Sequence, residues 1–206
     1  SSGGFEGMAI SPDGTTLYPL LERPLVGDPA GELLIHALDL ADSDTATSTY
    51  TGDRWTFPLG AGAVAIGDFQ LYDDADGALQ GVIIERDGSN GDVNGVKRVV
   101  AVELGAPGTS VGNEIVADLV AIRDPFPQRR VFQPGDIGIG TERFSFPFVT
   151  IESVVVLSPT LLLVANDNNF PGGGGRHPSS PDDNEFIRIR INPGQALTGA
   201  PSLLRD

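Results

Sequence analysis

Acidic residues open short apolar segments at three places in this chain. They are Glu6, Asp68 and Glu152. A second apolar segment follows each one and ends on another carboxylate or amide, and these residues are Glu22, Glu85 and Asn166. Carboxylates are rarely buried without a partner. If the three segments repeat around an axis, their acids converge and need a cation.

The residues near these positions supply hard oxygen ligands for a metal ion. Calcium takes about 6 to 8 oxygen atoms from carboxylates, amides, carbonyls and water. The candidate ligands are Glu6, Asp68, Glu152, Asn166 and Asp167. We expect Ca²⁺, with magnesium or manganese open, because no histidine-rich set indicates zinc. The alternative is structural: each acid accepts backbone N–H groups from a neighbouring repeat and fixes its register.

A few cationic residues could bind a phosphate group near these acids. Arg86 follows Glu85 directly, and these two are the candidate catalytic residues. Arg143, Arg176 and His177 lie in or beside long loops and are candidate substrate-binding residues. Arginine binds phosphate in a bidentate manner, and a metal can activate water for in-line attack. Alternatively, Arg86 pairs with a nearby acid and His177 is a solvent-exposed loop residue.

A second calcium candidate is the acidic run 90–95, Asn-Gly-Asp-Val-Asn-Gly. Its oxygens alternate as in the first half of a calcium loop. The twelfth position is Ala101 rather than a glutamate, and strand sequence follows it. We therefore favour an ordinary Gly/Asn turn.

Short strands between turn signals must position all these residues. Val-, Ile- and Leu-rich segments recur in one order, and 115–130 is the only stretch where a helical turn is expected. Trp55 and the alternating Phe144, Phe146 and Phe148 are expected to be core, and His36 a packing residue. The pattern predicts an all-β fold, a partial β-propeller of about three to four blades. A propeller closes with about 4 to 8 blades. We therefore expect one domain over residues 1–206, incomplete on its N-terminal side and completed by absent sequence or another chain.

Composition excludes several functions. The net charge of −15 disfavours nucleic acid and anionic membranes as partners. There is no cysteine, which excludes disulfides and thiolate chemistry. No apolar run is long enough to span a membrane. A Gly-x-Ser-x-Gly elbow, a phosphate loop and a Rossmann fingerprint are all missing from the sequence.

Several segments together resemble the bacterial phytase-like family described by the "esterase-like activity of phytase". They are Gly4–Gly14, Ala65–Asp68, Ile84–Asp87, Phe146–Glu152, Val164–Pro171 and Asp182–Phe186, in the order of the family. The resemblance implies a β-propeller, usually exported, so a secreted or periplasmic bacterial protein. It also implies phosphoester hydrolase activity on a small-molecule phosphoester or ester. Members of the family are typically longer on the N-terminal side.

Two classes of function remain open at this stage. The first is a metal-dependent phosphoester hydrolase, with a lactonase-type esterase that uses one central calcium as its variant. The second is a noncatalytic propeller that binds a ligand or partner, with its acids purely structural. Three carboxylates around one axial point favour an enzyme, whereas acids occupied by backbone N–H groups favour a scaffold.

Overall fold

The computed structural model describes residues 3–40, 47–73, 79–140 and 142–204. Strands dominate these residues, and the helical turns among them are two short 3₁₀ segments. The turn η1 (Pro127–Arg129) falls where a helical turn was expected, and η2 (Pro193–Gln195) was not expected. Among the described residues, no helix reaches the length and apolar character that a membrane crossing requires.

The first sheet, blade 1, contains four antiparallel strands in sequence order. They are β1 (Phe5–Ile10), β2 (Thr16–Leu21), β3 (Glu32–Asp39) and β4 (Thr49–Pro58). Buried and less buried residues alternate along β3, as expected for a strand with one face on a core.

The second sheet, blade 2, repeats this order. Its strands are β5 (Ala65–Asp73), β6 (Leu79–Arg86), β7 (Lys97–Leu104) and β8 (Gly112–Asp118). All six residues from Gly81 to Arg86 in β6 are buried, because this sheet packs on both of its faces.

The third sheet, blade 3, has three strands among the described residues. They are β11 (Ile151–Ser158), β12 (Leu161–Asn166) and β13 (Phe186–Arg190). A small two-stranded sheet, β9 (Ile122–Arg123) with β10 (Arg143–Phe144), lies between blades 2 and 3 in sequence.

Two hydrophobic cores hold the blades together, and blade 2 contributes to both. One core lies between blades 1 and 2 and includes Trp55. The other lies between blades 2 and 3 and includes Phe144, Phe146 and Phe148, so the expectation that these aromatic residues are core is confirmed. His36 packs edge-on against the rings of Phe5 and Tyr50, as expected of a packing residue.

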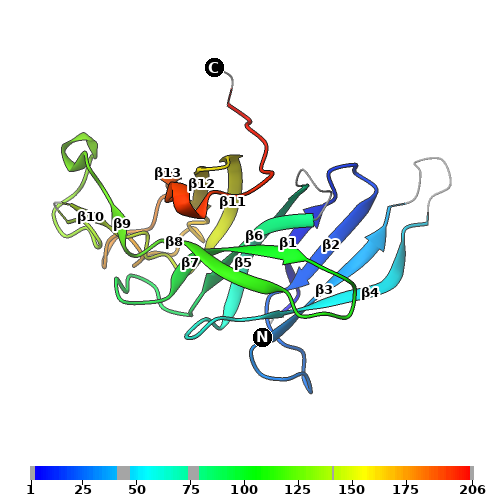
Figure 1. The fold of residues 1–206 in the computed structure, drawn as a ribbon. Coiled ribbons are helices and arrows are strands. Elements are labelled where there is room, and N and C mark those ends of the chain that lie inside the picture. The colour runs from blue at the N-terminus through cyan, green and yellow to red at the C-terminus, as the bar shows by residue number, and fades with distance from the viewer. Residues whose placement is uncertain (1–2, 41–46, 74–78, 141, 205–206) are drawn as a thin grey trace.

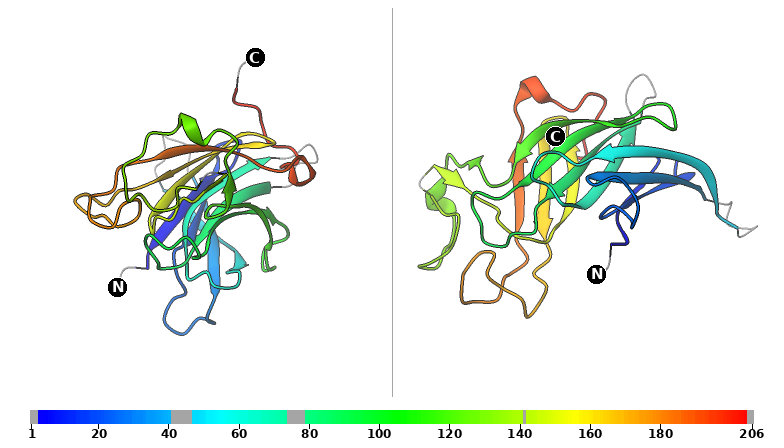
Figure 2. Two further views of the ribbon diagram at one scale, coloured as in Figure 1. Left: turned by 90° about the vertical axis from the view of Figure 1, so that its left-hand side faces the viewer. Right: turned by 90° about the horizontal axis from the view of Figure 1, so that it is seen from below.

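The first strands of the blades lie next to one another. Strand β5 contacts β1 on one side and β11 on the other, and Figures 1 and 2 show blade 2 between blades 1 and 3. Gly7 permits the approach of β1 to β5, because a Cβ there would lie 2.8 Å from the Cβ of Phe69. Up-and-down sheets arranged radially with their first strands inside form a partial β-propeller.

Candidate functional site

A β-bulge interrupts the opening end of each first strand. The register shifts fall between Phe5 and Gly7, between Ile66 and Asp68, and between Ile151 and Ser153. The extra residues are therefore Glu6, Gly67 and Glu152. Glu6 and Glu152 are equivalent, but Asp68 lies one residue further along. The expectation that all three acids share one position is therefore wrong in blade 2.

The extra residue of the bulge in blade 2 is a glycine because there is no space for a side chain. A Cβ at Gly67 would lie 1.9 Å from the backbone carbonyl oxygen of Ile151. Strand β11 therefore approaches β5 at this point more closely than any side chain permits. The acid of blade 2 consequently sits on the next residue.

The second strands end on residues that are also equivalent between blades. The residues that pair with the position before each bulge are Leu21, Glu85 and Asn166. The residues that follow them are Glu22, Arg86 and Asp167. Blades 1 and 3 thus carry a carboxylate where blade 2 carries a guanidinium.

Arg86 and Glu22 form a buried ion pair between blades 1 and 2. The Nη2 atom of Arg86 donates to Oε1 of Glu22 at 3.0 Å, and the two residues are 6% and 5% exposed. Arg23 donates to the same oxygen at 3.1 Å from the surface. Within the described part of the chain, the buried Nε of Arg86 has no hydrogen-bond partner.

The pKa of Glu152 depends on the charged residues around this pair. Burial raises the pKa of Glu152, and Asp167, Glu6 and Glu22 raise it further, whereas Arg86 opposes them. Five charged groups from three blades therefore interact here. We call Glu6, Glu22, Arg86, Glu152 and Asp167 the charged cluster.

Asp68 has a different environment from the charged cluster. Its Oδ1 accepts from the N–H of Phe69 and its Oδ2 from the N–H of Val154, both at 2.8 Å. Burial raises the pKa of Asp68, and these two hydrogen bonds oppose the rise. Gln70 likewise accepts the N–H of Val156 at 2.8 Å. Asp68 thus accepts a backbone N–H group from the neighbouring blade and joins β5 to β11, which is the structural role named above as the alternative to metal binding. Its metal-binding role stays a prediction.

Glu85 and Arg86 point to different partners. The fully buried Glu85 accepts the N–H of Gly60 at 2.7 Å and Nε of Arg98 at 2.6 Å. Neighbouring residues of a strand point to opposite faces. The structure therefore separates the two side chains that the sequence proposed as a catalytic pair, and a catalytic role for Glu85 stays a prediction.

Asn166 and Asp167 also differ in their contacts. The buried amide of Asn166 accepts the N–H of Glu185 at 2.7 Å and donates to the carbonyl of Asp183 at 3.1 Å. Asp167 is exposed, and its Oδ1 accepts the N–H of Asn169 at 3.2 Å. Asn166 therefore anchors the end of the long loop, whereas the charge of Asp167 raises the pKa of Glu152.

Two of the three candidate substrate-binding residues, Arg176 and His177, lie in the loop between β12 and β13, and Arg143 lies on β10 of the small sheet. Arg176 is buried and makes a bidentate pair with Glu185, at 2.7 and 2.8 Å. It shares a cavity of about 530 Å³ with His177, whose Nδ1 accepts the N–H of Ser179 at 3.2 Å. The exposed Arg143 lines another cavity, of about 300 Å³, and its Nε donates to the carbonyl of Val120 at 3.3 Å. Binding of substrate by these residues stays a prediction.

Comparison with known proteins gives one match. The sequence model of the phytase-like family, described as "esterase-like activity of phytase", matches residues 1–170. The chain belongs to this family. No curated protein and no solved structure matches the chain. The match confirms the resemblance drawn from the sequence and agrees with the propeller architecture.

The phytase-like chain has the donor chemistry for calcium but not a converged donor set. Carboxylate oxygens are the ligands that calcium prefers. Within the described residues, however, no group of three or more His, Cys, Asp or Glu side chains lies close enough to hold a metal ion. The side chains as they stand therefore do not fit a complete metal site, and calcium binding stays a prediction.

The second calcium candidate, residues 90–95, lies next to a buried lysine that binds the residues before it. Lys97 is buried, pairs with the carboxylate of Asp87, and donates to the carbonyl of Ser89 at 2.9 Å. Burial raises the pKa of Asp87, but the Lys97 ammonium and the N–H of Val96 outweigh it and lower that pKa to about 2. Asp92 accepts the N–H of Asn94 at 2.8 Å, the contact of an ordinary Asx turn.

The sequence reasoning left Glu22 out of the candidate site. Its signal was its place directly after a second strand, which the structure shows to be equivalent to the places of Arg86 and Asp167. The pairing with Arg86 joins residues 64 positions apart, and no local pattern shows such a contact.

Proposed function

We propose that this phytase-like chain belongs to a hydrolase of small phosphoric esters and that the charged cluster is its reacting site. The observation that carries the proposal is Arg86, a cation among acids. Within the described residues its guanidinium donates one hydrogen bond, from Nη2 to Glu22. A guanidinium that keeps donors free can bind the oxygens of a phosphoryl group. The family match supports the same class of reaction.

Within this proposal, Arg86 and Glu152 have separate roles. Arg86 holds the non-bridging oxygens of the phosphoryl group and balances their charge. Glu152 keeps its proton to a higher pH than an ordinary glutamate, because burial and nearby carboxylates raise its pKa. It can therefore donate that proton to the leaving alcohol oxygen as the P–O bond breaks, while Asp167 takes the proton of the attacking water.

Calcium dependence remains part of the proposal as a separate question. A bound divalent cation would supply positive charge for the phosphate and for the acids of the cluster. The candidate ligands remain Glu6, Asp68, Glu152, Asn166 and Asp167, and their side chains would have to move closer together to hold it. Thermal melting and turnover measured with calcium and with a chelator decide the matter, and identical results in both conditions would exclude a calcium requirement.

The second candidate is a noncatalytic propeller. Asp68, Gln70 and Glu85 favour it, because each uses its side-chain oxygens on backbone N–H groups or on an internal arginine. In that case the buried Arg86–Glu22 pair only joins two blades. Turnover of p-nitrophenyl phosphate separates this candidate from the hydrolase, and p-nitrophenyl acetate tests the esterase variant.

The deciding variant is Glu152→Gln, which keeps the size of the side chain and removes its titration. We expect a loss of about 100-fold or more in turnover of p-nitrophenyl phosphate, the usual contribution of a general acid. Ser153→Ala, on the neighbouring exposed residue, is the matched control and should retain full turnover. No turnover by the wild-type chain, alone and with the missing blades restored, with or without calcium, would reject the hydrolase. Full turnover by Glu152→Gln would reject the role of Glu152.

Export also stays a prediction, because it rests on the family resemblance. Cell fractionation of the natural host, followed by detection of the chain, tests it. Finding the protein only in the cytoplasmic fraction would contradict it.

A further inference from the structure

Arginines gather in a groove beside the last strand of blade 3. One cavity, of about 370 Å³, is lined by Arg123, Arg129, Arg130 and Arg188. A second, of about 390 Å³, is lined by Arg123, Arg188 and Arg190. Because Arg123 and Arg188 line both cavities, the two lie next to each other. We call the five residues and the space between them the arginine groove.

The groove is positive on a strongly negative protein. The chain carries a net charge of −15 with 13 Lys and Arg residues, and five of these line the groove. The carboxylates among the lining residues are Asp118 and Asp124. Asp124 is already paired with Arg130, and Asp118 accepts the N–H of Val120 at 3.0 Å. The arginines therefore outnumber the acids and attract anions locally.

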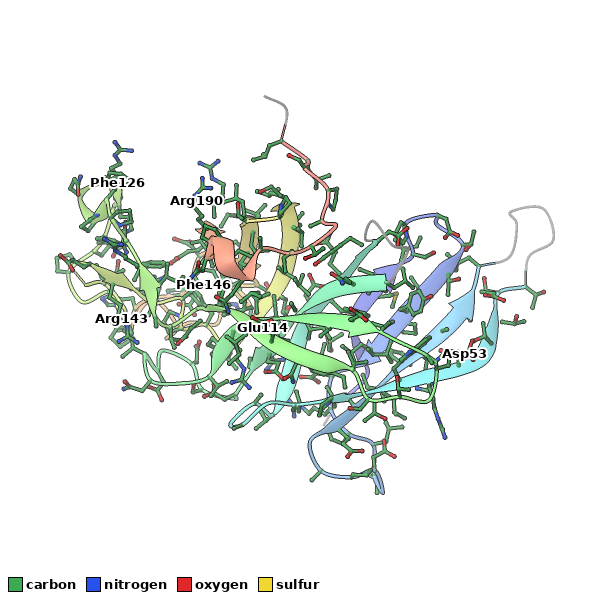
Figure 3. The ribbon with its side chains drawn as sticks, in the orientation of Figure 1. Asp53, Glu114, Phe126, Arg143, Phe146 and Arg190 are labelled. Carbon is green, nitrogen blue, oxygen red and sulfur yellow. The ribbon has the colours of Figure 1, made fainter. Side chains whose placement is uncertain are left out.

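The elements around the groove keep most of the guanidinium groups available. In the described part of the chain, no ion pair engages Arg123, Arg129, Arg188 or Arg190. Arg129 lies over the ring of Phe126, 4.5 Å from its centroid, and this contact leaves its N–H donors free. Figure 3 labels two residues that line these cavities, Phe126 just before η1 and Arg190 at the end of β13.

Strands hold three of the five arginines of the groove. Arg188 and Arg190 alternate with the buried Ile189 along β13, so both lie on its exposed face. Arg123 belongs to β9, where pairing with β10 fixes its position opposite Arg143. Apolar residues, among them Ile122, Ile187 and Ile189, line the same groove. The charges are thus placed by ordered elements and not by a flexible tail.

We propose that the arginine groove binds a small molecule that carries at least two phosphate groups. Each cavity has the size of a small-molecule site, about 300 to 1,000 Å³. Guanidinium groups on two facing elements can hold two phosphates at once in bidentate contacts. A groove formed by β9, η1 and β13 differs from the charged cluster, which lies at the opening ends of β1, β5 and β11. Binding there needs no hydrolysis, so it goes beyond the proposed function.

The test is calorimetric titration of the whole chain with pyrophosphate at low ionic strength. Wild-type protein should bind pyrophosphate at least tenfold more tightly than orthophosphate. Arg123→Gln combined with Arg188→Gln should weaken pyrophosphate binding at least tenfold, because both residues line the shared part of the groove. Arg54→Gln is the matched control, since Arg54 is an exposed arginine on β4 outside the groove.

Wild-type protein that does not bind pyrophosphate more tightly than orthophosphate would overturn the proposal, and so would either of two results with the variants. One is unchanged pyrophosphate binding in the double variant, with its thermal melt confirming that it is folded. The other is an equal loss in Arg54→Gln, which would mean only general attraction of anions. Turnover of p-nitrophenyl phosphate keeps this test apart from the proposed reaction. The double variant should retain turnover, and Glu152→Gln should lose turnover but still bind pyrophosphate.

Discussion

At the scale of single residues, the molecule depends on charges that are buried in pairs. Arg86 and Glu22 show this, because each is nearly inaccessible and each compensates the other. Removing one partner of such a pair costs more than removing both, since an unpaired charge then remains in the interior.

The Arg86–Glu22 pair gives a first prediction. Arg86→Met should destabilise the chain by about 3 to 5 kcal/mol, because it leaves Glu22 buried without its main partner. The double variant Arg86→Met with Glu22→Leu should recover much of that loss. Urea unfolding measures both. A double variant less stable than Arg86→Met would contradict this prediction, and the single variant Glu22→Leu completes the cycle that measures the coupling.

Asp87 gives a prediction about pH. Its pKa is about 2 in the folded chain and 3.8 ordinarily, so it contributes stability that is fully present above pH 3.8. This contribution declines as the pH falls through about 2. Asp87→Asn should therefore be less stable than wild type at pH 7, and the difference should shrink toward pH 2. Urea midpoints at several pH values measure it, and a constant difference would contradict the assignment.

At the scale of elements, contacts between first strands set the geometry of the candidate site. Asp68 and Gln70 accept N–H groups of β11, and Gly67 admits the carbonyl of Ile151. These contacts fix β5 against β11 and so place the bulge of blade 3 near the end of β6.

Replacement of Asp68 tests this element directly. Asp68→Leu should lower stability by about 1 to 3 kcal/mol, because the N–H of Val154 loses its buried acceptor. Asp68→Asn should cost less, since an amide oxygen can still accept one hydrogen bond. Thermal melting with calcium present and absent checks both. If Asp68→Asn instead abolished a calcium-dependent rise in melting temperature, Asp68 would be a metal ligand.

The elements also show what the sequence could and could not predict. Strands, blades and aromatic core residues followed from periodicity and turn signals, because both are local. The bulge at Gly67 did not, because it depends on the pairing of β5 with β6 and on the close approach of β11. Glu85 contacts Arg98 on the neighbouring strand, and Arg86 pairs with Glu22 on the neighbouring blade. The sequence alone does not show these contacts, so it assigned Glu85 and Arg86 to one site.

At the scale of the whole molecule, blade 2 connects two cores. Val99 belongs to the core shared with blade 3, and its neighbour Val100 belongs to the core shared with blade 1. Adjacent residues of β7 thus report on opposite interfaces of the same blade.

These two valines test whether the blades unfold together. Val99→Ala and Val100→Ala should each lower stability by about 2 kcal/mol through lost burial and a small cavity. Each should shift one common transition in differential scanning calorimetry, because blade 2 cannot lose one face alone. Separate transitions, with each variant affecting a different one, would show that the two cores unfold independently.

The charges that follow the second strands limit which blades can replace one another. Blades 1 and 3 end on acids, and blade 2 ends on Arg86. A chimera with its middle blade replaced by a copy of either neighbour would bring three like charges together. Such a chimera should fold only with an added counter-ion, so the blades are not interchangeable modules. The order of the blades along the chain places the arginine of blade 2 between the acids of blades 1 and 3.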